Sequence, residues 1–112
     1  MPTIASPELH AKAVSEVRNV AVDFRGRLDD GELLSGTPTV TQATLVPTNV
    51  GVNVAEKKIN GWTVAIGQAV QFQVPAGGTP STVYTFQISC ATNSTPAQTL
   101  RALVLMLVVA DS

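Results

Sequence analysis

Charged residues and cysteine are both scarce in this chain of 112 residues. Only 13% of the residues are charged and the net charge is −1 at pH 7, whereas soluble domains usually carry about twice that charged share. A protein that binds nucleic acid through the phosphates needs a surplus of positive charge, so we expect no nucleic-acid partner. The single cysteine, Cys90, has no mate within the chain, which excludes a small secreted scaffold held together by its own disulfides.

Long apolar runs are also absent. The longest spans residues 102–110, whereas a membrane-spanning helix needs about 20 apolar residues. Residues 1–8 contain neither a basic start nor an apolar segment, so they do not resemble a signal peptide. With 45% hydrophobic residues, the chain has too much apolar surface to stay disordered. We therefore expect one soluble domain with no membrane partner.

The few charges are concentrated near the start of the chain. Most of them lie in residues 8–32, and after Lys58 only Arg101 and Asp111 remain. Two interpretations of this charge-poor second half are open. Its surface is either exposed to solvent through threonine, serine, glutamine and asparagine side chains, or buried against other subunits. The second interpretation rests on the depletion of charge at the centres of interfaces.

The dominant pattern has a period of two, with apolar residues alternating with small or polar ones, as in residues 70–74 and 84–90. Successive side chains of a strand point to opposite faces, so each such run predicts a half-buried strand. Turn sequences separate the runs, and Asn60-Gly61 is the strongest hairpin signal among them. The pattern predicts about seven strands, near residues 17–24, 33–41, 50–56, 62–66, 69–74, 82–91 and 99–110.

Short turns leave no room for crossover helices, so the predicted fold class is all-β, a two-sheet antiparallel sandwich formed by residues 17–112. Tyr84 begins the sixth strand, where an immunoglobulin-like sandwich has a structural tyrosine whose hydroxyl binds the backbone. The predicted core consists of the inward residues of these strands: Val20, Val22, Phe24, Val52, Val54, Trp62, Val70, Phe72, Tyr84, Phe86, Ile88, Cys90, Leu103 and Leu105.

Residues 1–16 lack a strand pattern and are predicted to form an N-terminal arm. Ser6, Pro7 and Glu8 suit the start of a helix, which would continue over residues 9–14 for one or two turns. So short a helix is unstable on its own. The arm is therefore expected either to dock on a neighbouring subunit or to be disordered.

The last predicted strand is apolar on both faces, interrupted only by Arg101. Both faces of such a strand must be shielded from solvent. One face meets the core, and the other is covered either by a loop or the N-terminal segment, or by another subunit. On the second interpretation the candidate interface residues are Val104, Met106, Val108, Leu9 and Arg18.

Residues that support catalysis or metal binding do not occur in usable sets. His10 is the only histidine, and one histidine with one distant cysteine does not provide the set of ligands that a metal site needs. Asp29, Asp30 and Glu32 do not have the spacing of an EF-hand calcium loop, and acids beside Gly31 are typical of a turn. No nucleophile with a paired base can be assembled. The sequence therefore predicts a protein that is not an enzyme and has no metal, cofactor or small-molecule substrate.

Five segments nevertheless resemble a known family. Residues 17–24 (VRNVAVDF), 27–36 (RLDDGELLSG), 70–74 (VQFQV), 77–79 (GGT) and 84–88 (YTFQI) are similar to small structural proteins of tailed bacteriophages, in particular the phage fibre-tail adaptor family. The resemblance covers roughly residues 12–110. It implies an immunoglobulin-like domain without catalysis, and it transfers no active-site residue. The chain departs from the family pattern by a longer N-terminal arm and an unusually apolar final strand.

The resemblance and the charge-poor surface together lead to one expected function. The chain is expected to be a multi-copy virion protein, made in the host cytoplasm, that joins head, tail or fibre components and contacts other virion proteins and copies of itself. A capsid decoration protein on the head shell is the alternative in the same class. A third alternative is a glycan-binding sandwich for host adhesion, which would require an exposed aromatic residue such as Trp62 beside a groove.

Overall fold

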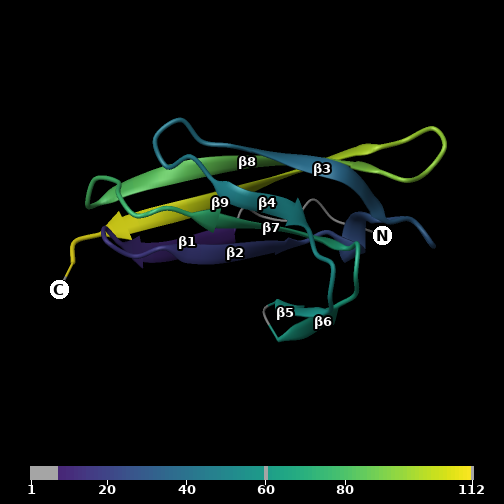
Figure 1. Cartoon of the computed structure of the whole chain (residues 1–112), viewed down its shortest axis with the longest axis horizontal. Helices are drawn as coiled ribbons and strands as arrows, with labels where there is room; N and C mark the ends of the chain where they lie inside the picture. The colour runs from purple at the N-terminus through teal and green to yellow at the C-terminus, as the bar shows by residue number, and fades with distance from the viewer. Residues whose placement is uncertain (1–7, 60, 112) are drawn as a thin grey trace.

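Nine β-strands and one short 3₁₀ turn form the part of the chain that this computed structural model describes, residues 8–59 and 61–111 (Figure 1). In chain order they are β1 (Glu8–Ala13), β2 (Arg18–Asp23), η1 (Arg25–Arg27), β3 (Leu34–Thr41), β4 (Thr48–Val52), β5 (Lys57–Ile59), β6 (Trp62–Val64), β7 (Ala69–Val74), β8 (Thr82–Thr92) and β9 (Thr99–Val109).

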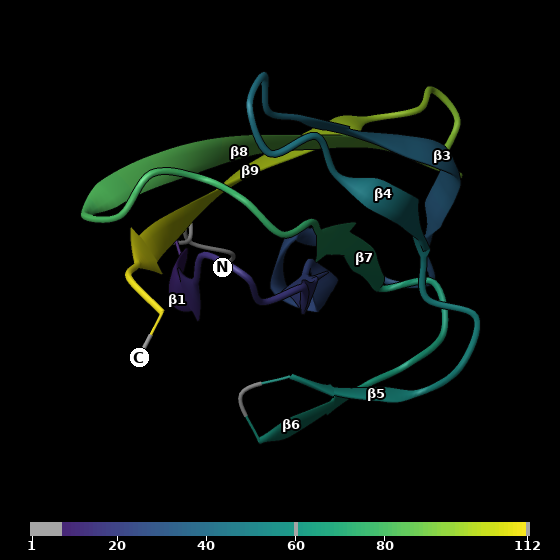
Figure 2. The same ribbon diagram turned by 60° about the vertical axis from the view of Figure 1, so that its left-hand side comes forward.

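The strands form an all-β sandwich, as predicted. One sheet has the order β1-β9-β8-β3, the second has the order β2-β7-β4, and the hairpin β5-β6 lies outside them (Figure 2). The pairing is antiparallel throughout the described sheets except between β1 and β9, which run parallel. The prediction of purely antiparallel sheets is therefore wrong at this one pair. Assignment to the immunoglobulin-like fold stays a prediction.

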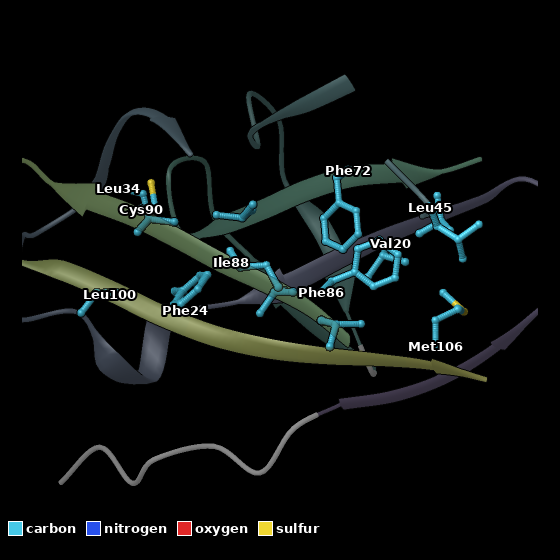
Figure 3. Packing of buried hydrophobic residues seen from close by; sticks show 14 of the residues in the cluster. Val20, Phe24, Leu34, Leu45, Phe72, Phe86, Ile88, Cys90, Leu100 and Met106 are labelled. Carbon is cyan, nitrogen blue, oxygen red and sulfur yellow. The ribbon is translucent and has the colours of Figure 1, made fainter. Parts of the chain in front are cut away.

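The core lies between the two sheets and is built from alternate residues of the central strands (Figure 3). Phe72 of β7 and Phe86 of β8 meet at its centre, with ring centroids 5.5 Å apart. Val52 and Tyr84 are half-buried and pack against this cluster. The other predicted core positions that are buried are Val20, Val22, Phe24, Val70, Phe72, Phe86, Ile88 and Cys90.

Tyr84 has the structural role predicted for it. Its hydroxyl oxygen accepts a hydrogen bond from the backbone N–H of Thr79, at 2.8 Å. Hydrogen bonding from the side chain and then from the backbone of Thr79 lowers the pKa of Tyr84 below its usual value. The tyrosine therefore fixes the loop that precedes β8 to the sandwich.

Two predicted core residues, Val54 and Trp62, are exposed instead, at 84% and 64%. β4 ends at Val52 and the chain then bends, so that Asn53 turns inward. The Asn53 amide oxygen accepts hydrogen bonds from the backbone N–H groups of Gly67 and Ala69, each at 3.0 Å. Trp62 belongs to the hairpin that lies outside the sandwich, and the small cluster that this hairpin buries contains Ile59 and Val64 but not Trp62.

The facing predicted for the last strand is wrong. Val104, Met106 and Val108 were placed at an interface, but all three are completely buried in the core. Leu103 and Leu105 were placed in the core, but they point outward, and Leu103 is 42% exposed. The reason is the pairing with β8. Met106 lies opposite Tyr84 and Val104 lies opposite Phe86, so the strand turns the same face inward as the aromatic residues.

The predicted helix in the N-terminal arm is also wrong. Residues 8–13 form β1, which pairs along the edge of β9 and is therefore a strand of the sandwich. A free edge of a long apolar strand offers a row of unpaired backbone groups, and a short isolated helix has nothing comparable to stabilise it.

Residues 1–7 of the predicted arm lie outside the described residues, as does Asn60 of the predicted hairpin turn. Gly61, its neighbour in the turn, has φ of +83°, a conformation that favours glycine.

Candidate functional site

The outward face of the sheet β1-β9-β8-β3 carries an unusual row of aliphatic side chains. Along β9 the burial pattern alternates, so that one set of residues enters the core and the other points away from it. The outward set after Arg101 is Leu103, Leu105, Leu107 and Val109. A solvated sheet face normally alternates apolar-in with polar-out, and β9 has no polar residue on its outward side beyond Arg101.

The strands on both sides of β9 widen this row. Leu9 of β1 lies beside Leu105 in the register, and Ala11 lies beside Leu107. On the other side Val83 of β8 lies opposite Leu107. Leu9 is 67% exposed and Val83 is 50% exposed. We call the whole set the outer apolar patch, and it consists of Leu9, Ala11, Val83, Leu103, Leu105, Leu107 and Val109.

A buried lysine fixes β1 in this position. Lys12 is 1% exposed, and its ammonium group donates hydrogen bonds to three backbone carbonyls. The acceptors are the oxygens of Ala13 at 2.8 Å, Val14 at 3.1 Å and Gly77 at 3.0 Å. The bond to Gly77 joins the end of β1 to the loop before β8. β1 is thereby held beside β9, and its outward side chains extend the outer apolar patch.

A second contact holds the two ends of this edge together. The Asp111 carboxylate accepts hydrogen bonds from the backbone N–H and the hydroxyl of Ser15, at 3.1 and 3.0 Å. These bonds lower the pKa of Asp111 below its ordinary value. The turn after β1 and the segment after β9 are therefore tied to each other at the end of the patch.

The face is large enough to form a subunit contact. β8 and β9 have eleven residues each, β3 has eight and β1 has six, so the four strands together present a face of about 600 Å². A stable complex buries about 800 Å² on each partner. The polar residues beside the patch, such as Thr85 and Gln87 of β8, are neutral. On the outward side of β9 itself, the only charged side chain is Arg101.

The structure gathers only part of the predicted interface. Leu9 lies in the outer apolar patch, whereas Arg18 is exposed on β2, in the other sheet. Val104, Met106 and Val108 belong to the core, as described above. The patch residues that the sequence pattern assigned to neither the core nor the interface are Ala11, Val83, Leu107 and Val109. Arg101 carried the signal that identifies Leu107 and Val109, because an unpaired charged side chain normally points to solvent and residues at intervals of two from it share its face.

The described residues offer little for other chemistry. Within residues 8–59 and 61–111, no three His, Cys, Asp or Glu side chains gather closely enough to hold a metal ion. In the same ranges no helix is long and apolar enough to cross a membrane. Burial raises the pKa of the Cys90 thiol, which makes the reactive thiolate form rarer.

Comparison with known proteins shows a shared fold only. No family model and no curated protein matches the sequence. Among solved structures, the chain is similar to a protein from Saccharophagus degradans described as nucleoside hydrolase-related, hypothetical and associated with carbohydrate metabolism. The TM-score is 0.53 at 12% sequence identity, over 92% of this chain and 22% of that chain. The chain thus spans about a fifth of that protein's length, and what the two share is the fold.

Proposed function

We propose that this chain is a structural protein of a tailed-bacteriophage virion, present in several copies that contact one another through the outer apolar patch. In this role it joins head, tail or fibre components and performs no catalysis. The observation that carries the proposal is the patch itself, an aliphatic row on the exposed face of a sheet. The patch supports the contact between copies, and the sequence resemblance to phage fibre-tail adaptors supports the virion role.

A second copy of the chain is the partner that fits the patch best. The patch is aliphatic, so it offers no charge pattern that would select a partner of opposite sign. Two sheet faces pack about 10 Å apart with interdigitating aliphatic side chains. In a twofold contact the patch need only be complementary to itself. The area of the face, about 600 Å², lies at the lower end of what stable complexes bury on each partner and is consistent with such a pairing.

Sedimentation velocity of the purified chain over a range of concentrations tests this pairing. We expect the natural chain to self-associate and Leu103→Glu to weaken the association about tenfold or more, because a buried, unpaired carboxylate is costly. Leu103 is 42% exposed in the single chain, so the variant should fold. Val54→Glu, at a position that is 84% exposed and outside the patch, is the matched control and should associate normally. A natural chain that stays monomeric at high concentration would refute the pairing.

Quantitative mass spectrometry of purified phage particles tests the virion role. We expect the chain to be present at a fixed number of copies per particle. A dozen or fewer indicates a connector, and hundreds indicate a decoration protein on the shell. Particles that lack the chain altogether would contradict the proposed function.

A further inference from the structure

A groove lies on the opposite side of the sandwich from the outer apolar patch. The hairpin β5-β6 folds across the outer face of the sheet β2-β7-β4 and covers only part of it (Figure 1). Ile59 and Val64 of the hairpin pack there against Ala69 and Ala21. The rest of the face remains open and forms a groove of about 400 Å³, which is within the range of small-ligand sites.

The floor of the groove is made of side-chain amides. Asn19 of β2, Gln71 and Gln73 of β7 and Asn49 of β4 all line it. The Asn49 amide donates to the Gln73 oxygen at 3.3 Å, and the Gln73 amide donates to the Asn19 oxygen at 3.1 Å. This chain of bonds leaves the NH₂ group of Asn19 and the oxygen of Asn49 available. Gln71 makes no side-chain hydrogen bond within the described part of the molecule. The floor therefore presents donors and acceptors together.

An irregularity in β4 places Asn49 in this row. The register between β4 and β7 shifts between Thr48 and Gly51, and Asn49 within the shift has φ of +53°. Such a conformation is uncommon outside glycine, and asparagine is one of the few residues that adopt it readily. Bulges of this kind redirect a side chain and are frequent next to binding sites.

The wall of the groove is positively charged. Lys57 and Lys58 of β5 line it, and among residues 8–59 and 61–111 neither ammonium group forms an ion pair or a hydrogen bond. Trp62 lies opposite Ile59 in the hairpin register, and Ile59 itself lines the groove. The Trp62 ring is 64% exposed, and the Arg25 guanidinium lies 5.1 Å from its centroid.

We propose that this groove binds an acidic oligosaccharide, one whose sugar rings carry carboxylates. Each sugar hydroxyl can both donate and accept a hydrogen bond, and the side-chain amides of the groove floor provide acceptors and donors for it. The unpaired lysines at the wall would hold the carboxylates. Trp62 does not line the groove, but it lies beside Ile59 at the groove wall and serves as a reporter there. A single small anion would use the lysines but leave the amide floor empty.

Isothermal titration calorimetry with trigalacturonic acid tests the site, and the fluorescence of Trp62, the only tryptophan, reports whether the ligand binds near the hairpin. We expect trigalacturonic acid to bind and to change the fluorescence. Gln71→Ala and Lys58→Ala should each weaken binding about tenfold. Gln87→Ala and Arg101→Ala remove an amide and a cation from the other sheet, and they should bind normally.

Three other ligands complete the experiment. Maltotriose has no carboxylate, inorganic phosphate has no sugar, and a triglutamate peptide has carboxylates on a peptide. We expect all three to bind at least tenfold more weakly than trigalacturonic acid. Equal binding of any of them, or no binding of trigalacturonic acid, would overturn the proposal. Leu103→Glu, which disrupts only the outer apolar patch, should leave this binding unchanged, so that the two proposals fail separately.

Discussion

At the scale of single residues, the buried ammonium group of Lys12 is the least expected feature. It lies in a core-facing position of β1, without an acidic partner at hydrogen-bonding distance among the described residues, and backbone carbonyls satisfy its three donors. The carbonyls of Ala13 and Val14 also accept backbone N–H bonds, from Glu16 and Gly77. The oxygen of Gly77 has no other donor among the described residues and depends most on the lysine.

We expect Lys12→Met to destabilise the protein by about 1–3 kcal/mol, because it leaves a buried carbonyl without a donor while nearly preserving the volume of the side chain. Urea denaturation measures the loss. Lys58→Met, at an exposed position, is the control and should have almost no effect. Equal midpoints for the natural chain and Lys12→Met would mean that the three hydrogen bonds contribute nothing to stability.

Glu32 is a second buried charged residue, at 5% exposure. Its carboxylate accepts hydrogen bonds from the backbone N–H of Asp29 at 3.0 Å and from the Gln98 amide at 3.0 Å. Hydrogen bonding from Ser94, then from Asp29 and Thr92, lowers its pKa from the ordinary value of 4.5 to about 2. The group thus joins the turn before β3 to the loop between β8 and β9.

The pKa of Glu32 predicts a specific loss of stability in acid. The folded state holds the proton less tightly than the unfolded state, so the stabilisation is complete above pH 4.5 and is lost as the pH falls towards about 2. In urea denaturation at a series of pH values, Glu32→Gln should lack this part of the acid dependence. Glu56→Gln, an exposed carboxylate, should retain it. Parallel pH profiles for Glu32→Gln and the natural chain would contradict the assignment.

At the scale of elements, β9 determines which face of the molecule is apolar. Met106 is completely buried, and Leu103 on the opposite side of the same strand is 42% exposed. We expect Met106→Ala to cost about 2–5 kcal/mol, because it leaves a cavity in the core. Leu103→Ala should cost less than about 1 kcal/mol in dilute solution. Thermal or urea unfolding of the two variants measures the difference, and equal losses would show that the facing of β9 is misassigned.

The same strand shows how far a sequence pattern can be followed. Alternation predicted β2, β7 and β8 with the correct facing, because polar residues such as Gln71 and Gln87 mark the outward side. In β9 both faces are apolar, so alternation alone carries no information about facing, and the register with β8 decides it. Arg101 was the single residue that could have resolved the choice.

β1 and β5 were missed for a related reason. β1 contains Lys12 at an inward position, which interrupts the apolar pattern. This buried lysine is tolerated because backbone carbonyls, among them that of Gly77, accept hydrogen bonds from its ammonium group. β5 is three residues long, too short to show a period. The groove could not be predicted at all, since its amides come from β2, β4 and β7, and only the sheet brings them together.

At the scale of the whole molecule, the two candidate surfaces lie on opposite sides of one sandwich. The outer apolar patch belongs to the sheet β1-β9-β8-β3, and the groove belongs to the outer face of β2-β7-β4 (Figure 2). Copies that associate through the patch would therefore keep the groove open. An assembly of this kind presents one ligand site for each copy, and weak single sites gain strength when several act together.

The parallel pairing of β1 with β9 has a consequence for how the chain folds. Glu8 is aligned with Val104, so this contact joins segments from nearly opposite ends of the described sequence. On the ribosome, β1 emerges before the other described strands but has no edge to join until β9 has been translated. Among the described strands, β1 is thus made before its partner and placed late, and the nascent chain must keep it free of wrong partners until β9 is made.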